Sequence, residues 1–391
     1  MKQKLNVIFI GSFLYPNGYA ATKRKQQFLD YIKDKGDTVR VLLTLKRAKG
    51  HELNSVKGRY KGIPYEVVGS NVKPNSLFPI TFLLMLVKAF QYLALNKKKH
   101  HKNIIVAFAI NYHTLFPLLW GKILGYKIVF DIVEDFSTLQ NSKTLKEKIK
   151  KFMFRAFPKI FKKFLANGIS VISSYLYNDH ENFIGSIPVT LVPISAENLF
   201  YLLDKSQSQT FKLLYSGTYG EKEGLPSLFD AFHKFSQFEK NTTLTLTGNC
   251  PDHIVELLKE KLGNLNKIEL TGRLDDRKYY QKLKDADVLL MTRTNSGFAN
   301  AGFPYKLGEY LATKNPVICT DTSDISLYLK DMESSVIIPP DDKNALYKAM
   351  CFLYENSTIS KDIGEKGYKV CETLFHPVTN SKKFYQLLES C

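Results

Sequence analysis

One segment, Asp287 to Asp321, restricts most strongly the folds that this sequence can adopt. It opens with a short apolar run, DVLLMT, and continues with a loop of small and polar residues that includes Asn295. A helix is expected to begin near Pro304 and to end before Asn315, and a second apolar run, PVICTD, follows at once. Strand, loop, helix and strand in this order predict a parallel α/β sheet, which binds ligands at the carboxyl ends of its strands.

The predicted helix of this segment carries the residues of a nucleotide site. Pro304 suits the first helical turn, where no backbone N–H is needed, and the N–H groups of such a turn bind phosphates. Glu309 lies about one and a half turns further along and can accept hydrogen bonds from a ribose diol. The competing interpretation is a surface glutamate on an ordinary amphipathic helix.

The alternation of short apolar runs with helices extends over the whole chain of 391 residues. It begins with a buried strand at residues 5–12, followed by a glycine loop and a helix over residues 21–35. A polar piece at residues 197–210 precedes a second series, and residues 46–62 are expected to form an exposed loop. We therefore expect an α/β chain of two doubly wound, Rossmann-like domains, each with roughly six strands. The expected limits are 1–200 for the N-terminal domain, rejoined by a C-terminal helix at 376–391, and 201–375 for the C-terminal domain.

The composition argues against several classes of protein. The five cysteines are scattered and include no CxxC pair, so we expect neither a disulfide framework nor a zinc site, and a reducing compartment is favoured. The N-terminus enters a strand without a signal-peptide pattern, and every stretch of about 20 residues contains charge, so no spanning helix is expected. No DxD pair marks a metal site, and we expect none.

Positive charge is concentrated in the first half of the chain. Residues 1–200 contain 31 lysines and arginines against 12 aspartates and glutamates, a formal charge of +19. Residues 201–391 contain 24 against 25, a formal charge of −1. Such a basic half is expected to meet an anionic surface, which is either lipid or nucleic acid. Nucleic acid is the weaker alternative because the sequence lacks a known reading motif.

Two helical segments of this basic half combine apolar and cationic residues. The first, residues 77–95, is apolar along most of its length and precedes the run KKKHHK, and the second covers residues 142–165. Helices of this kind lie in a membrane interface, where the cations meet anionic lipid. The alternative is an apolar stripe packed on a sheet beneath a solvated basic face. The two segments together favour a peripheral membrane location.

Candidate site residues follow the predicted strands in both halves. The second half offers Gly217 with the GEKEG loop and its Lys222, then Arg273, then the segment from Asn295 to Glu309. Cations and backbone N–H groups around one crevice suit a nucleoside diphosphate. The first half offers the following residues: Gly18, His113 and a carboxylate cluster of Asp131, Glu134 and Asp135.

At this point the chain resembles the retaining GT-B glycosyltransferases of glycosyltransferase family 4, of the kind that builds bacterial cell-surface polysaccharides. The resemblance covers nearly the full length, and its motifs are fairly specific to the fold and moderately specific to the family. It rests on these segments: GYAATKRKQQFLDYIKDKGDTVRVLL, IVFDIVEDF, VISSYL, TLVPISAENLF, LLYSGTYGEKEGLPSLFDAF, ELTGR, DADVLLM, FPYKLGEYLATKNPVICTD and VIIPPDD.

The resemblance implies two domains that face each other across a cleft, the C-terminal one binding a UDP- or GDP-sugar and the N-terminal one an acceptor. It implies retention, independence from metal ions and no cofactor. Glu309 matches the second Glu of the family's E-x7-E motif, which binds the donor's ribose. The expected donor-binding residues are Gly18, Gly217, Thr218, Lys222, Arg273, Asn295, Gly302, Phe303, Pro304, Tyr305, Lys306 and Glu309. The expected catalytic residues are His113, Asp131 and Glu134.

The sequence departs from the family pattern at several positions. Ala301 stands where the family has the first Glu of E-x7-E, and Val133 where it often has a His. The family's Arg and Lys after the SGT-like strand fall on Thr218 and Glu223. Lys222, with Arg273 or Arg293, is expected to supply the missing charge.

These observations predict a hexosyltransferase-type enzyme, EC 2.4, at the cytoplasmic face of the plasma membrane. It would transfer sugar from a nucleotide donor to a glycan or lipid-linked acceptor in capsule or O-antigen synthesis. Two alternatives stay open: a sugar-nucleotide epimerase on the same fold, and a non-catalytic GT-B protein that binds a partner enzyme. The substitution at Ala301 favours the second of these.

Overall fold

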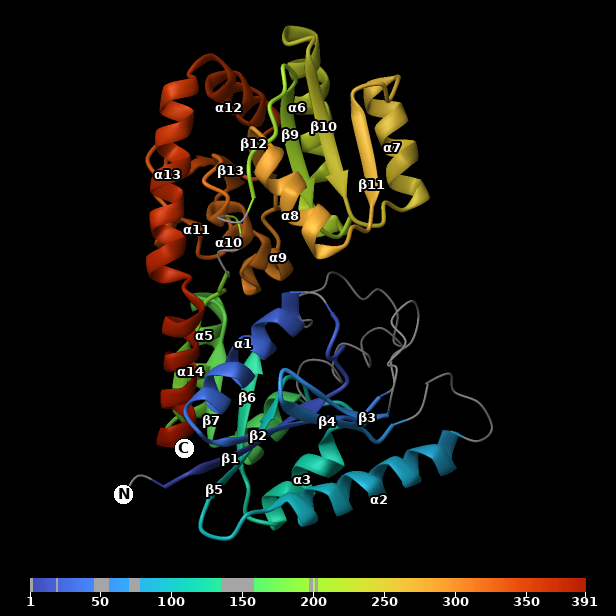
Figure 1. Ribbon diagram of the computed structural model, residues 1–391, viewed down its shortest axis with the longest axis vertical. Coiled ribbons are helices and arrows are strands. Elements are labelled where there is room, and N and C mark those ends of the chain that lie inside the picture. Colours follow the sequence, from blue (N-terminus) through green and yellow to red (C-terminus); the bar gives the residue numbers. More distant parts are fainter. Residues whose placement is uncertain are drawn as a thin grey trace. The chain divides into compact units, whose positions relative to one another are not determined.

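The structure is a computed structural model that describes residues 3–18, 20–45, 56–69, 78–134, 158–196, 200 and 203–391 (Figure 1). The chain divides into two compact units. Unit 1 comprises Met1–Pro193 and Val378–Cys391, and unit 2 comprises Ile194–Pro377. Asp135, most of the predicted second basic helix (142–157) and part of the predicted linker (197–199 and 201–202) lie outside the described residues.

Unit 1 contains an eight-stranded sheet in the order β3-β4-β2-β1-β5-β6-β7-β8. All neighbouring strands are parallel except β3 and β4, which are antiparallel. The strands are β1 (Leu5–Gly11), β2 (Thr38–Leu43), β3 (Lys57–Tyr60), β4 (Ile63–Val67), β5 (Lys102–Ala107), β6 (Lys127–Ile132), β7 (Gly168–Val171) and β8 (Val189–Leu191).

Helices cover both faces of this sheet (Figure 1). Along β1, alternate residues such as Val7 and Phe9 face a core that includes Phe28 of α1 and Phe384 of α14. The Phe28 and Phe384 rings stack with centroids 4.1 Å apart, which fixes the C-terminal helix on unit 1. The helices are α1 (Ala20–Asp34), α2 (Phe78–Asn96), α3 (Leu115–Ile123), α5 (Ser174–Ile184) and α14 (Pro377–Ser390), and residues 158–165 are also helical.

The prediction of an exposed loop over residues 46–62 is wrong at its end, where β3 pairs with β4. Lys57 and Arg59 alternate with smaller or aromatic residues, so the segment lacks the apolar pattern of a strand. The turn between the strands uses Lys61 and Gly62, both with positive φ, of 48° and 80°. A lysine at such a position gives no recognisable hairpin signal, because asparagine and glycine are the residues that usually mark it.

Unit 2 contains a six-stranded parallel sheet in the order β11-β10-β9-β12-β13-β14. The strands are β9 (Phe211–Ser216), β10 (Thr242–Thr247), β11 (Ile268–Gly272), β12 (Val288–Met291), β13 (Val317–Thr320) and β14 (Val336–Ile338). The helices are η3 (Glu221–Glu223), α6 (Leu225–Phe238), α7 (Asp252–Leu262), α8 (Asp276–Asp285), α9 (Gly297–Ala301), α10 (Tyr305–Ala312), α11 (Ile325–Tyr328), α12 (Lys343–Glu355) and α13 (Ser357–Leu374).

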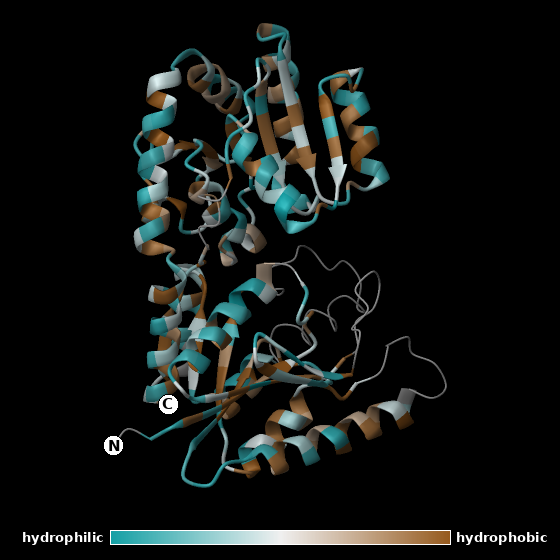
Figure 2. Ribbon diagram, in the orientation of Figure 1, coloured by the Kyte–Doolittle hydropathy of each residue, from teal (hydrophilic) through white to brown (hydrophobic). Residues whose placement is uncertain are grey.

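The strands of unit 2 are apolar where they meet the helices (Figure 2). Leu213 and Tyr215 of β9 lie in a core with Leu228 and Phe232 of α6, and all four are buried. The order of the strands reverses its direction between β9 and β12, so the loops after these strands leave the sheet at a switch point. Open α/β sheets bind their ligands at such a point, outside the carboxyl ends of the strands.

Candidate functional site

The loop that leaves β9 forms one side of the candidate site in unit 2. Gly217 follows the strand directly and has φ of +146°, a conformation that side chains rarely adopt. A Cβ built at this position would lie 3.0 Å from Nζ of Lys306. The absence of a side chain therefore lets the lysine ammonium reach the backbone where β9 ends.

Helix α10 is fixed to the end of β9 by Tyr310. The backbone N–H of Ser216 donates to the Tyr310 hydroxyl at 2.7 Å, and both groups are buried. This bond also sets the position of the first turn of α10, which carries Tyr305 and Lys306. The predicted helix over this segment is thus present, and its start lies at the carboxyl edge of the sheet.

Glu309 lies on α10 and is almost fully buried. The Tyr279 hydroxyl of α8 donates to Glu309 Oε2 at 2.9 Å, and the Ser216 hydroxyl lies 3.1 Å from the Tyr279 oxygen. Burial and the Glu309 carboxylate raise the pKa of Tyr279 well above its ordinary value, so its hydroxyl stays protonated and donates. Glu309 is therefore a held, oriented carboxylate. The alternative of a surface glutamate on an ordinary helix is excluded.

Lys306 forms a buried ion pair with Glu223. Its Nζ lies 2.6 Å from Glu223 Oε2, and the exposed fractions of the two side chains are 12 % and 3 %. Burial alone would raise the pKa of Glu223, but the charges of Lys306, Arg293 and Lys222 outweigh it and lower the pKa to about 2. The carboxylate is thus ionised at neutral pH.

The backbone around Glu223 is fixed by contacts with the loop after β12. The Thr292 hydroxyl donates to the Glu223 carbonyl at 2.9 Å, and Thr294 N–H donates to the Lys222 carbonyl at 3.0 Å. Gly224 follows with φ of +61°, and a Cβ there would overlap the Thr292 carbonyl oxygen. The glycine is therefore required both by conformation and by space.

The other predicted donor-binding residues of unit 2 lie in segments that follow its strands. Lys222 lies over the Phe298 ring at 4.3 Å, and Thr218 is exposed. Arg273 is exposed directly after β11. Asn295 is also exposed, and its Oδ1 accepts from Asn300 at 2.8 Å.

The residues from Gly302 to Tyr305 join two helices. The short helix α9, which the sequence pattern did not predict, ends at Ala301, and Arg293 Nη1 donates to the Gly302 carbonyl at 3.2 Å. Phe303 packs against Phe375, with ring centroids 5.8 Å apart, and Pro304 is the N-cap of α10. Gly302, Phe303 and Pro304 are buried and form the support beneath the first turn of α10. Tyr305 is half-buried at that turn.

In unit 1, Gly18 and His113 lie in loops after β1 and β5. A Cβ at Gly18 would overlap the Thr22 side chain, whose hydroxyl donates to the Leu14 carbonyl at 2.6 Å. His113 is 4 % exposed, and its ring nitrogens have no hydrogen-bond partner within the described part of the chain. Burial lowers the pKa of His113 to about 4, so the imidazole is neutral at pH 7.

Asp131 has the contacts of a structural ion pair. Its carboxylate accepts from Nε and Nη2 of Arg24 at 3.0 and 2.9 Å and from the Ser170 hydroxyl at 2.8 Å, and it is fully buried. Glu134 is exposed just beyond β6. Within unit 1, the structure gives these two carboxylates different environments, and the catalytic roles predicted for them stay predictions.

Four residues that sequence reasoning missed complete the geometry of the site: Tyr215, Glu223, Tyr279 and Tyr310. The tyrosines were interpreted as strand or helix residues, because an aromatic at those spacings indicates a core. Glu223 was noted only as a departure from the family pattern. Its partner lies 83 positions further along the chain, so no local signal joins the two.

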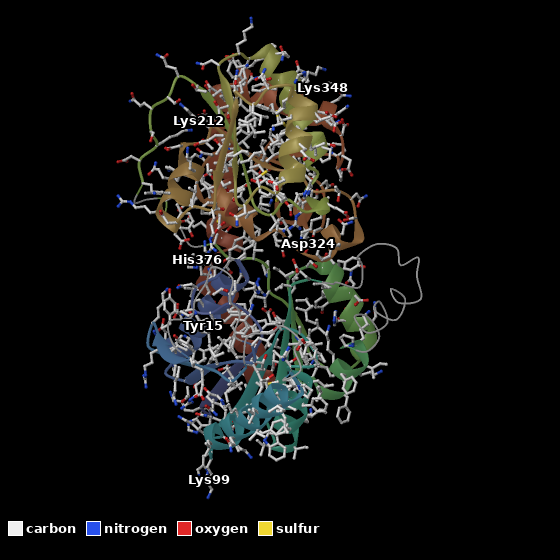
Figure 3. All side chains as sticks on the ribbon, turned by 90° about the vertical axis from the view of Figure 1, so that its right-hand side faces the viewer. Tyr15, Lys99, Lys212, Asp324, Lys348 and His376 are labelled. Carbon is white, nitrogen blue, oxygen red and sulfur yellow. The ribbon has the colours of Figure 1, made fainter. Side chains whose placement is uncertain are left out.

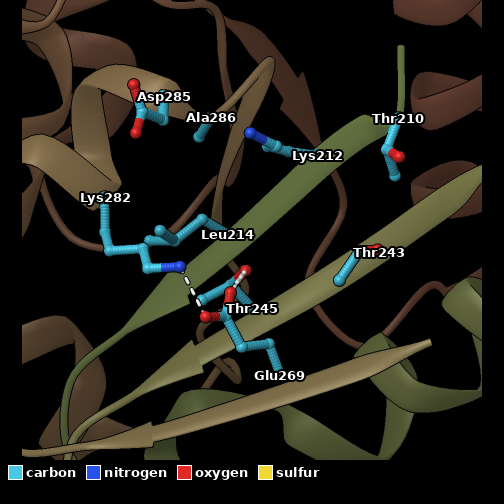
Figure 4. Close-up of a pocket in the computed structure, with 9 residues that line it drawn as sticks. All are labelled: Thr210, Lys212, Leu214, Thr243, Thr245, Glu269, Lys282, Asp285 and Ala286. Carbon is cyan, nitrogen blue, oxygen red and sulfur yellow. Dashed lines mark hydrogen bonds and ion pairs between the residues drawn. The ribbon is translucent and has the colours of Figure 1, made fainter. Parts of the chain in front are cut away.

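Two further features of the described residues lie outside this arrangement. Over the ranges that the structure describes, no group of three or more His, Cys, Asp or Glu side chains has the geometry of a metal site. A pocket of about 220 Å³ lies against β9, β10 and β11 beside α8 (Figure 4). Its Glu269 is engaged by Lys282 and by the Thr245 hydroxyl, so its carboxylate is already bound.

Comparison with known proteins finds a family similarity within unit 2. Residues 210–356 match the family described as glycosyl transferases group 1. A search of curated proteins finds no match to the chain.

Solved structures resemble the chain over nearly all of its length. Sucrose-phosphate synthase from Thermosynechococcus elongatus has a TM-score of 0.75 at 14% identity, covering 98% of both chains. HepE from Anabaena in complex with UDP has a TM-score of 0.71 at 16% identity, covering 99% of this chain and 100% of HepE. A glycosyltransferase from Rickettsia africae has a TM-score of 0.71 at 14% identity, covering 98% of both chains. These matches confirm the predicted fold class, an α/β chain with two Rossmann-like domains of the GT-B type.

Proposed function

We propose that this protein is a retaining glycosyltransferase that takes a sugar from a UDP- or GDP-sugar. One observation carries the proposal: the carboxylate of Glu309, held by Tyr279, and the ammonium of Lys306 share one helix at the carboxyl edge of the unit 2 sheet. The match of residues 210–356 to glycosyl transferases group 1 supports it. So does the fold shared with HepE, which has been solved with UDP and with UDP-glucose.

The chemistry assigned to this site is donor binding and stabilisation of the leaving group. Glu309 would accept hydrogen bonds from the ribose diol, and the first-turn N–H groups of α10 would face the diphosphate. When the bond between the anomeric carbon and the diphosphate oxygen breaks, negative charge grows on that oxygen. Lys306 would stabilise this charge, a role that a metal ion has in other enzymes. We therefore propose a metal-independent reaction.

The acceptor class is inferred from unit 1, where α2 presents an apolar face to solvent. The residues of this apolar α2 face are exposed large aliphatics at helical spacing: Ile80, Leu83, Leu84, Val87 and Leu95. Figure 2 shows how apolar α2 is along its length. A helix of a soluble domain normally turns such residues inward, so an exposed apolar stripe indicates an interaction surface.

The opposite side of α2 is packed onto unit 1. Met85, Ala89 and Leu93 are buried, and the Tyr126 hydroxyl donates to the Leu93 carbonyl at 2.8 Å. Residues Pro79–Asn96 are long and apolar enough to cross a membrane by length and composition, and 17% of that stretch is buried. Because one side is bound to the unit along its length, we propose that α2 lies on a bilayer and does not cross it.

Other elements of unit 1 also expose apolar residues, and one of them, α3, packs against α2. Phe116 and Ile123 of α3 are exposed, as are Ile160 and Phe164 of the helical residues 158–165. Figure 3 shows the Lys99 side chain, in the run after α2, extending away from unit 1. An apolar face with a basic border suits the anionic cytoplasmic leaflet of a plasma membrane. We propose that the acceptor is a lipid-linked saccharide of surface polysaccharide synthesis, such as capsule or O-antigen.

One observation favours a second candidate, a non-catalytic GT-B protein that binds a partner enzyme. Ala301 stands at the first glutamate position of the resemblance motif and is fully buried. In that case unit 2 would keep its fold but would not catalyse sugar transfer.

A transfer assay separates these candidates. The purified protein is incubated with radiolabelled UDP- and GDP-sugars and a bacterial lipid extract, with Glu309→Gln as the variant and Glu260→Gln, at an exposed residue of α7, as its control. The proposal expects label in the lipid fraction with the wild type and the control, and much less with Glu309→Gln. An epimerised free nucleotide sugar would indicate the epimerase, and no turnover of any donor would favour the non-catalytic protein.

Membrane docking is tested by flotation with vesicles. Leu83→Ser/Leu84→Ser removes two residues of the apolar α2 face, and Leu270→Ser removes an exposed leucine from unit 2 as a control. We expect the wild type and the control to float with phosphatidylglycerol vesicles and the double variant to stay behind. Equal flotation of the double variant, or no flotation of the wild type, would contradict the membrane proposal.

A further inference from the structure

The cation of the candidate site is accompanied by a carboxylate from a distant loop. Lys306 lies in the first turn of α10, and its Nζ donates to Oε2 of Glu223 in η3 at 2.6 Å. The Tyr215 hydroxyl, which donates to the Thr218 carbonyl at 2.6 Å, lies 3.1 Å from the same carboxylate oxygen. Lys306 Nζ also lies over the Tyr215 ring, 4.2 Å from its centroid. Two contacts, with the Glu223 carboxylate and with the Tyr215 ring, therefore define the position of the ammonium.

Lys306 also lies beside Gly217, the glycine that follows β9. Its Nζ lies 3.0 Å from the site that a Cβ of Gly217 would occupy. The ammonium therefore lies beside the backbone of the loop after β9, and Glu223 is its anionic partner there.

Glu223 also affects the pKa of Lys306, together with the other charges around the pair. The groups that face Lys306 are Glu223 and Lys222 of η3, Arg293 after β12 and the Tyr215 phenol of β9. Burial lowers the pKa of Lys306, the charges of Lys222 and Arg293 lower it further, and Glu223 opposes these effects. Glu223 therefore favours the protonated form of Lys306. The three cations exceed the single carboxylate, so the cluster keeps a positive charge.

We propose that Glu223 is a positioning residue that holds the Lys306 ammonium over Gly217 as the cation that receives the donor's diphosphate. This inference rests on the proposed function, since it assigns a role within the same donor site. Glu223 itself would not touch the donor. It would act through the place and the protonation of Lys306.

The test compares binding of a nucleoside diphosphate with binding of the nucleoside alone, by titration calorimetry at about pH 6 and about pH 9. Glu223→Gln removes the charge and keeps the shape, Glu223→Asp is the conservative variant, and Glu260→Gln, at an exposed residue of α7, is the control. We expect Glu223→Gln to weaken diphosphate binding by about tenfold at the higher pH, because a charge-assisted hydrogen bond is lost. The loss should be smaller at the lower pH, where protonation of the amine is favoured, and nucleoside binding should not change.

A second measurement separates positioning from folding. In the Lys306→Met background, Glu223→Gln should produce no further loss of diphosphate affinity, because its effect passes through the lysine. Glu223→Asp should recover most of the wild-type affinity. Thermal midpoints of all variants are measured alongside, so that a variant that fails to fold is recognised and Glu223→Asp then decides the question.

The outcomes that overturn the inference differ from those that overturn the proposed function. If the wild type binds no nucleoside diphosphate, the donor site itself is wrong. If the wild type binds it and Glu223→Gln binds it equally or more tightly at both pH values, the donor site stands and Glu223 has no positioning role. Tighter binding would show instead that the carboxylate competes with the diphosphate for Lys306.

Discussion

The buried pair of Arg24 and Asp131 allows a prediction that separates structure from catalysis. Both side chains are nearly inaccessible, at 2 % and 0 % exposed. The guanidinium also donates to the carbonyls of Val192 and Pro193, at 2.9 and 2.7 Å, so it connects α1, β6 and the chain after β8. Asp131→Asn would leave a buried guanidinium without its counter-ion, which costs about 3–5 kcal/mol. For a domain of about 200 residues this lowers the midpoint of thermal unfolding by about 6–20 °C.

The single tryptophan makes the measurement specific to unit 1. Trp120 lies in α3, and its indole N–H donates to the Phe90 carbonyl at 3.3 Å, so its fluorescence follows the unfolding of this unit. Urea titrations of Asp131→Asn should show a lower midpoint with little change in slope. In Arg24→Met/Asp131→Leu both charges are gone, and much of the stability should return.

A catalytic role for Asp131 predicts a different result. Asp131→Asn would then abolish sugar transfer, while the free energy of unfolding measured from the Trp120 signal stayed within about 1 kcal/mol of the wild type. That outcome would refute the structural account of this pair. A double variant as unstable as the sum of its single variants would also refute it, because the two residues would then act independently.

Two further predictions concern a glycine and a histidine. Gly224→Ala should destabilise unit 2 by more than about 2 kcal/mol, because it adds an overlap with the backbone to the cost of positive φ. Gly263→Ala, where φ is +73° and the space is open, should cost about 1 kcal/mol. Urea unfolding followed by circular dichroism measures both. Because burial lowers the pKa of His113 to about 4, the unfolded chain binds this proton more readily. The stability that His113 contributes is therefore full above about pH 6.5 and is lost as the pH falls toward 4, by about 2 kcal/mol at pH 5. His113→Phe should remove this part of the pH dependence of the Trp120 signal, and an unchanged dependence would contradict the assignment.

The sequence was sufficient for features that depend on local pattern. Short apolar runs indicate buried parallel strands because both of their faces are covered, and the segment from Asp287 to Asp321 has the expected order of elements. Its position at the carboxyl edge of the sheet follows from the fold class. The sequence also showed that the helix at residues 77–95 is very apolar and is followed by cationic residues. Only the structure shows which of its residues face solvent.

The sequence was insufficient where the geometry depends on contacts between distant segments. Lys222 was expected to replace the cation missing at residue 223, because it is adjacent in the chain. That role of Lys222 stays a prediction, and the structure adds a contact between distant segments, since the Lys306 ammonium, from another helix, lies beside Gly217. Tyr279 and Tyr310 gave no signal either, because a tyrosine that orients a carboxylate and a tyrosine in a core have the same spacing. The hairpin of β3 was missed since its turn carries a lysine with positive φ.

The most direct test of the account is calorimetric titration of UDP and GDP into the wild type and Glu309→Ala, with Glu260→Gln as the control. The account predicts that one of the two nucleotides binds the wild type and the control. It predicts a loss of at least about tenfold with Glu309→Ala, because the hydrogen bonds from the ribose diol to a charged carboxylate disappear. Equal affinity in Glu309→Ala, or no binding of either nucleotide to the wild type, would contradict the donor site.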